Sequence, residues 1–140
     1  QKCYACVVID LEVNRASGAV QLLKATIAGE AGQYINPDGL ANQLEGGVVQ
    51  SASWTLKEQV TFDSTRITSL DWASYPILTF PEVPEVETYL INRSDLPSLG
   101  AGEGTQGPTP AAIANAIFDA TGMRLRDLPL TPDKIKAAIG

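Results

Sequence analysis

The sequence contains no histidine and only two cysteines among its 140 residues. The lack of histidine excludes histidine-based acid–base catalysis and histidine-ligated metals within this chain. No apolar run approaches the roughly 20 residues that a membrane-spanning helix needs. Lysine and arginine are not clustered and the formal net charge is −6, so the charge pattern argues against a nucleic-acid partner.

The two cysteines, Cys3 and Cys6, form a lone CxxC pair. They lie in a stretch typical of a β-strand, where residues three apart point to opposite faces of the sheet. We therefore expect ordinary buried thiols, with a redox or metal-binding role as the less favoured alternative.

The length and a composition of 44% hydrophobic and 19% charged residues indicate a single globular domain over residues 1–140. The chain begins at Gln1 rather than at methionine, and from the position of the first expected strand we expect a piece of a larger protein. The order of expected elements is ββ-α-β-β-α-α, which predicts an α+β fold with a mostly antiparallel sheet and helices packed on it. The expected ranges are 3–13, 18–28, 58–63 and 85–91 for strands, 37–56 for the first helix, and starts near 109 and 132 for the last two helices.

The first helix has the clearest signals, because Asn36 suits its N-cap and Pro37 its first turn. Its buried face is predicted by apolar residues four apart: Leu40, Leu44, Val48, Ala52 and Leu56. A second line on the same helix consists of Gln43, Gly47, Gln50 and Trp54. The adjacent glycines Gly46 and Gly47 each cost up to about 1 kcal/mol relative to alanine in mid-helix, which indicates either close helix packing or the close approach of a ligand.

The stretch GAGEGTQGPTP, residues 100–110, combines four of the 12 glycines with one carboxylate, Glu103. Its GxGxxG match is not typical of a dinucleotide site, because about ten residues separate it from the preceding strand. Two interpretations stay open. The loop is a flexible turn with an exposed glutamate, or its glycines admit a bulky cofactor beside a base, Glu103. The second predicts a desolvated pocket around Glu103 and free N–H groups at the start of the following helix.

Three segments, residues 35–63, 71–91 and 100–132, carry a resemblance to a known family. With NQLEGG, DWASYP and GAGE as their motifs, they resemble the C-terminal part of the large, molybdenum-cofactor-binding subunit of the xanthine/aldehyde oxidase family, the molybdenum hydroxylases. Within that family, the branch of isoquinoline 1-oxidoreductase beta subunits and related aldehyde dehydrogenases looks nearest. The resemblance covers roughly residues 27–139 of the numbered sequence.

The resemblance implies an oxidoreductase that hydroxylates an N-heterocycle or an aldehyde with oxygen derived from water. It implies that Glu103 is the general base that takes up the proton of the attacking hydroxyl. It further implies that five residues contact the cofactor and that none binds the metal itself: Gln43, Gly46, Gly47, Gly102 and Gly104. For Gln50 and Trp54, support of the cofactor site and plain core packing stay open.

The implied cofactor is molybdenum–molybdopterin in its cytosine dinucleotide form, which the full enzyme holds and this piece alone does not. The implied partners are the remainder of the large subunit, a small iron–sulfur subunit and the heterocycle or aldehyde substrate. The compartment stays open between the cytoplasm and the periplasm of a bacterium. A piece of such an enzyme is expected to show an open loop around Glu103 and exposed apolar surface. The alternative is a standalone, non-catalytic ligand-binding or interaction module that retains the fold.

Overall fold

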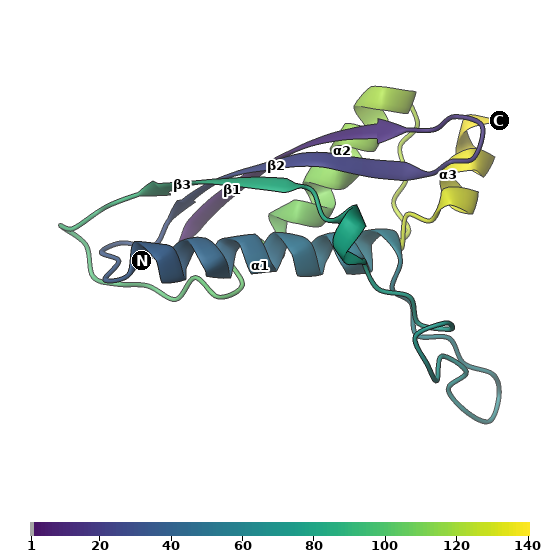
Figure 1. The fold of residues 1–140 in the computed structure, drawn as a ribbon, viewed down its shortest axis with the longest axis horizontal. Helices are drawn as coiled ribbons and strands as arrows, with labels where there is room; N and C mark the ends of the chain where they lie inside the picture. The colour runs from purple at the N-terminus through teal and green to yellow at the C-terminus, as the bar shows by residue number, and fades with distance from the viewer. Residues whose placement is uncertain (1) are drawn as a thin grey trace.

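The computed structural model describes residues 2–140. Over this range, three strands and three α-helices form two layers, a sheet and the helices against one of its faces (Figure 1). The elements in chain order are β1 (Tyr4–Val13), β2 (Val20–Glu30), α1 (Pro37–Leu56), the 3-10 turn η1 (Phe80–Glu82), β3 (Glu85–Ile91), α2 (Pro108–Thr121) and α3 (Pro132–Ile139).

The hairpin of β1 and β2 is confirmed, and its side chains alternate between the helices and solvent. Val7, Ile9 and Ile27 are buried on the inner face, as expected for strands with one covered face. The turn needs glycine at Gly18, where φ is +76° and a Cβ would overlap the carbonyl of Pro132. The start of α3 therefore packs directly against this turn.

The prediction of a mostly antiparallel sheet is wrong, because β3 pairs with β2 in parallel while β1 pairs with β2 antiparallel. The sheet is mixed, with the strand order β1-β2-β3. Helix α1 and the residues after it carry the chain back to the end of the sheet where β2 begins, which is the crossover that parallel pairing requires. The order of the elements agrees with the prediction except at residues 58–63, where only an isolated bridge between Phe62 and Ile67 replaces the expected strand.

Helix α1 has the predicted bounds and the predicted N-cap. The Asn36 side-chain oxygen accepts a hydrogen bond from the Gly39 N–H at 3.0 Å. Four of the five residues on the expected core face are buried, and Leu40 is partly buried: the four are Leu44, Val48, Ala52 and Leu56. They pack with Ile113 and Ile117 of α2 under the sheet, so α1 and α2 are held in a fixed relation to each other.

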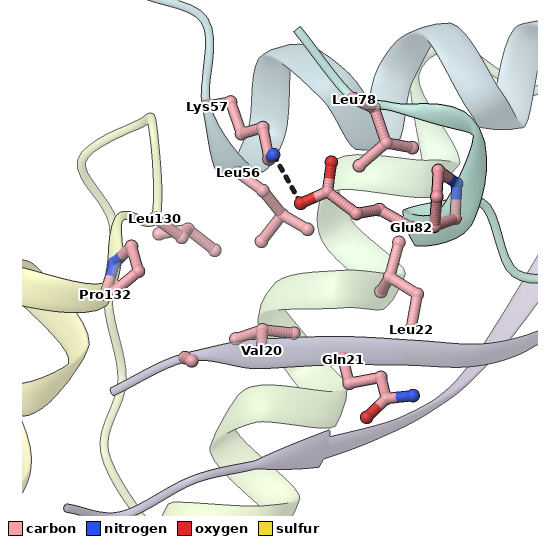
Figure 2. Close-up of a pocket in the computed structure, with 11 residues that line it drawn as sticks. Val20, Gln21, Leu22, Leu56, Lys57, Leu78, Glu82, Leu130 and Pro132 are labelled. Atoms are coloured by element: carbon pink, nitrogen blue, oxygen red, sulfur yellow. Dashed lines mark hydrogen bonds and ion pairs between the residues drawn. The ribbon is translucent and has the colours of Figure 1, made fainter. Parts of the chain in front are cut away.

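Residues 58–79 form an extended excursion that leaves the body after α1, which we call the arm (lower right in Figure 1). Two hydrogen bonds close its base: the Leu78 N–H donates to Ser53 Oγ at 2.8 Å, and the Tyr75 hydroxyl donates to Glu58 Oε2 at 2.8 Å. An ion pair between Lys57 and Glu82 joins the two chain segments just outside this base (Figure 2).

The same region contains a cavity of about 400 Å³ between the arm base, β2 and the segment before α3. Figure 2 shows that its walls are mainly apolar side chains, with the Lys57–Glu82 pair among them. The apolar lining comprises Val20, Leu22, Leu56, Leu78 and Leu130.

The Lys57–Glu82 pair predicts a defined dependence of stability on pH. Burial raises the pKa of Glu82, but hydrogen bonds from Lys57 and Thr79 outweigh burial and lower it from 4.5 to about 2. A carboxyl with a lowered folded-state pKa stabilises the protein above its unfolded-state pKa, and this contribution is lost as the pH falls from about 4.5 to about 2. Glu82→Gln should therefore lower the urea midpoint near neutral pH, and the difference from the parent should vanish toward pH 2.

The control for this prediction is Glu12→Gln, which makes the same change at an exposed position of β1. We expect it to leave the midpoint unchanged at every pH. A Glu82→Gln deficit of constant size from neutral to strongly acidic pH would contradict the proposed role of the ion pair.

Candidate functional site

The glycine-rich loop before α2 is anchored to α1 through Thr105. This residue is fully buried, and its hydroxyl donates to the Leu44 carbonyl at 2.7 Å. Its own carbonyl accepts from the hydroxyl and the N–H of Thr109, at 2.7 and 3.2 Å. A loop with these buried hydrogen bonds has a defined conformation, which argues against a flexible turn.

Gly47 lies where α1 and this loop meet. A Cβ on Gly47 would overlap Thr105 Oγ1 and would lie 3.7 Å from the Gln106 side chain. Gln106 extends the contact, since its Nε2 donates to Gln50 Oε1 at 2.8 Å. Close packing of the loop on the helix therefore accounts for the glycine at position 47, and Gln50 acts as a loop contact.

Gly46 has different surroundings, although it is the neighbour of Gly47. It is exposed, and a Cβ there would find no atom within 4 Å. Gly102 faces Gln43, because a Cβ on Gly102 would lie 3.2 Å from Gln43 Nε2. At Gly104 a Cβ would contact the Leu44 side chain at 3.3 Å, so the loop follows the surface of α1 closely at two points.

Glu103 is exposed at the tip of this loop, between Gly102 and Gly104. Next to it in the chain, Gly102 lines an open pocket of about 320 Å³ together with Gln43. The other lining residues are Gly39 and Leu40 of α1 and residues from the segments 31–36 and 98–101. The structure thus brings Gln43 and Gly102 together, and Glu103 follows Gly102 as an exposed residue that does not line this pocket. The desolvated pocket that we expect around Glu103 is not formed by residues 2–140 alone.

The expectation of free N–H groups at the start of α2 is wrong. The helix begins at Pro108, and its third residue is Pro110, so neither position has an N–H. The N–H of Thr109 between them donates to the Thr105 carbonyl. The first turn of α2 serves to hold the loop and offers these groups to no ligand.

The expectation of buried thiols is also wrong. Cys6 is exposed and Cys3 is only partly covered. Burial, followed by the nearby Glu30 carboxylate, raises the pKa of Cys3, which favours the unreactive thiol form. Among residues 2–140, no group of three or more histidine, cysteine or acidic side chains is placed to hold a metal ion.

For Thr105 and Gln106, the sequence suggested only that their backbone contacts the cofactor or holds Glu103 in place, and it did not predict the roles of their side chains. Each side chain forms a hydrogen bond with a residue more than 50 positions away in the chain, and neither residue belongs to a spacing pattern. The sequence signal for a close contact was the pair of mid-helix glycines, Gly46 and Gly47, which indicated close packing or a ligand at this part of α1. Trp54, the fourth residue of that line, is partly buried.

Solved structures of two larger oxidoreductases contain this fold. The chain superposes on quinoline 2-oxidoreductase from Pseudomonas putida 86 with a TM-score of 0.86 and 25% identity, over 94% of this chain and 18% of that one. It superposes on the aldehyde oxidoreductase from Desulfovibrio desulfuricans with a TM-score of 0.87 and 26% identity, over 99% of this chain and 16% of that one. None of the helices over the described range combines the length and apolar character needed to cross a membrane.

The fold is therefore that of a domain found within these larger oxidoreductases. The chain belongs to the molybdopterin cofactor-binding domain family, whose model matches residues 1–84. Its relatives include a nicotinate dehydrogenase subunit of Pseudomonas putida, 45% identical over 98% of this chain and 12% of the relative. The molybdenum-binding subunit PaoC of an Escherichia coli aldehyde oxidoreductase is 28% identical, over 96% of this chain and 19% of the relative. The chain thus spans less than a fifth of these relatives.

Proposed function

We propose that residues 1–140 form the C-terminal molybdopterin-binding domain of the large subunit of a molybdenum hydroxylase. The observation that carries this proposal is the loop that Thr105 anchors on α1, because it holds Gly102 close to Gln43 of the helix and exposes the next residue, Glu103. In the proposed enzyme, an N-heterocycle or an aldehyde is oxidised with oxygen derived from water. Family membership and the molybdenum-binding relatives support the proposal.

The residues of this loop and helix fit a molybdopterin cofactor. The Gln43 amide can both donate and accept hydrogen bonds, and the open space over Gly46 allows a bulky group to approach the helix backbone. Gly102 and Gly104 keep the loop free of side chains on either side of Glu103. When bound, the cofactor supplies the two-electron oxidation. Gly47 is included in the proposed contacts, although its packing against Thr105 already accounts for the glycine.

Glu103 is proposed to act as the general base. Either carboxylate oxygen can accept the proton of the hydroxyl group that attacks the substrate carbon. The glycines on both sides leave the carboxylate free to reach this proton, and Thr105 holds the loop that carries it. Because Glu103 is exposed in this chain, we propose that the remainder of the large subunit covers it and excludes water.

The identity values favour an N-heterocycle over an aldehyde as the substrate class. The nicotinate dehydrogenase subunit of Pseudomonas putida is 45% identical to this chain, whereas the aldehyde dehydrogenase of Gluconacetobacter polyoxogenes and PaoC are 32% and 28% identical. The expected nearness to the isoquinoline branch stays a prediction. The cytosine dinucleotide form of the cofactor, a small iron–sulfur subunit as partner, and weak cofactor binding by residues 1–140 alone are further parts of the proposal.

The test uses the complete large subunit, purified with its iron–sulfur partner. Metal analysis should find molybdenum, acid hydrolysis should release the cytosine nucleotide, and turnover of nicotinate in heavy-oxygen water should place the label in the product. A purified complex without molybdenum, or a product whose new oxygen comes from dioxygen, would refute the proposed function.

A further inference from the structure

The arm, residues 58–79, exposes a concentration of large apolar side chains that the proposed catalytic role does not use. Phe62 is 76% exposed, Trp72 74% and Leu70 69%. Three further apolar residues of the arm are more than 40% exposed, namely Val60, Ile67 and Ile77. Single exposed apolar residues are normal, but a group of this size on one segment marks an interaction surface.

Hydrogen bonds within the arm give it a defined conformation. The Thr68 N–H donates to the Thr61 carbonyl at 2.8 Å. Asp63 Oδ1 accepts from the N–H groups of Thr65 and Arg66, and Asp71 Oδ1 accepts from the Ser74 N–H at 2.9 Å. Asp63 and Asp71 themselves stay exposed, and their hydrogen bonds fix the turns that display the apolar side chains of the arm.

The arm is also remote from the loop that carries Glu103. Lys57, the residue just before the arm, follows Gln43 by about 14 positions along α1, which corresponds to roughly 20 Å along the helix axis. The closed base of the arm, at Ser53–Leu78 and Glu58–Tyr75, directs it away from the body (Figure 1). Its partner therefore does not have to lie over the candidate catalytic surface.

We infer that the arm docks into an apolar groove formed by the same large-subunit polypeptide outside these 140 residues. The relatives supply the length of chain for this role, since this chain spans only 12–19% of them. Four of the 22 arm residues are charged, Glu58, Asp63, Arg66 and Asp71. Large exposed apolar side chains such as Phe62, Leu70 and Trp72 are nevertheless typical of permanent interfaces, whereas transient partners meet through more polar surfaces. The inference rests on the proposed function, in that both place the chain within a larger subunit.

The test places the photo-crosslinker p-benzoylphenylalanine at position 62 of the complete large subunit, co-purified with its iron–sulfur partner. After irradiation, mass spectrometry should locate a crosslink within the same polypeptide, outside the present 140 residues. A crosslink to the iron–sulfur subunit or to a second copy would overturn the inference, and so would the absence of any crosslink. Molybdenum content, measured on the same sample, reports on the proposed function separately.

A pair of variants completes the test. Phe62→Ser/Trp72→Ser should leave the thermal unfolding of the 140-residue chain unchanged, because both side chains already face solvent there. In the complete subunit, the same change should lower the yield of folded protein several-fold, since the lost burial destabilises the docked state. The matched control, Phe62→Leu/Trp72→Phe, keeps the arm apolar and should restore the yield. Equal yields for the serine and control variants would overturn the inference.

Discussion

Replacing Glu103 by glutamine in the complete enzyme is expected to lower kcat by roughly 10²- to 10⁴-fold, which is the contribution of a positioned general base. Glutamine has nearly the same shape as glutamate but cannot take up the proton of the attacking hydroxyl at neutral pH. Molybdenum content should stay unchanged, because the loop is held by Thr105 and not by the Glu103 side chain. Steady-state turnover and metal analysis on one preparation measure both quantities.

The control is Glu12→Gln on the exposed outer face of β1, which should retain full turnover. Glu103→Asp keeps the carboxylate but withdraws it by one methylene, so partial activity is expected. Turnover of Glu103→Gln at the parent rate would contradict the assignment of a base. A loss of molybdenum in parallel with activity would also contradict it, because the residue would then support cofactor binding.

Alanine substitutions at the adjacent positions Gly47 and Gly46 are expected to change the stability of the domain in opposite directions. At Gly47, the new methyl group would overlap Thr105 Oγ1. Overpacking of this kind costs about 1–3 kcal/mol, and the better helix propensity of alanine offsets up to about 1 kcal/mol. At Gly46 there is no atom within 4 Å, so only the propensity gain remains. Urea unfolding of the 140-residue chain measures both changes.

The Thr105→Ala background shows whether the overlap is the cause. Without the hydroxyl and methyl groups of Thr105, Gly47→Ala should become neutral or stabilising. The same destabilisation in both backgrounds would show that the overlap with Thr105 is not responsible.

Gly46→Ala in the complete enzyme tests whether the cofactor approaches the helix at this residue. We expect a lower molybdenum content despite the more stable domain, because the methyl group occupies the space proposed for the cofactor. Parent-level loading would remove Gly46 from the set of proposed contacts.

The bounds of helix α1 and the end of helix α2 could be predicted because their signals are local. Asn36 and Pro37 mark the start of α1, and α2 ends where Gly122 adopts φ +77°. The direction of β3 could not be predicted in this way. It depends on the whole path of residues 57–84, and the expected strand within that path belongs to the arm.

For the candidate site, the sequence located Glu103 and the unusual glycines but not the reason for each glycine. Gly46 and Gly47 are identical in the sequence, yet one borders open space and the other a buried hydroxyl. That difference arises from Thr105, whose bond to Leu44 spans 61 positions of the chain. Only the tertiary structure shows which glycine permits packing and which one borders open space.

The bond between Thr105 and Leu44 has a consequence for how precisely the proposed enzyme can be assembled. Together with the close packing of Gly47 on Thr105, it ties the backbone of the Glu103 loop to the helix that carries Gln43. Any misplacement of this domain during assembly then shifts the loop and the helix together, and the spacing of their backbones is preserved. The alignment of the two segments with a bound cofactor is thereby reduced to one adjustment, that of the domain as a whole, in place of two independent ones.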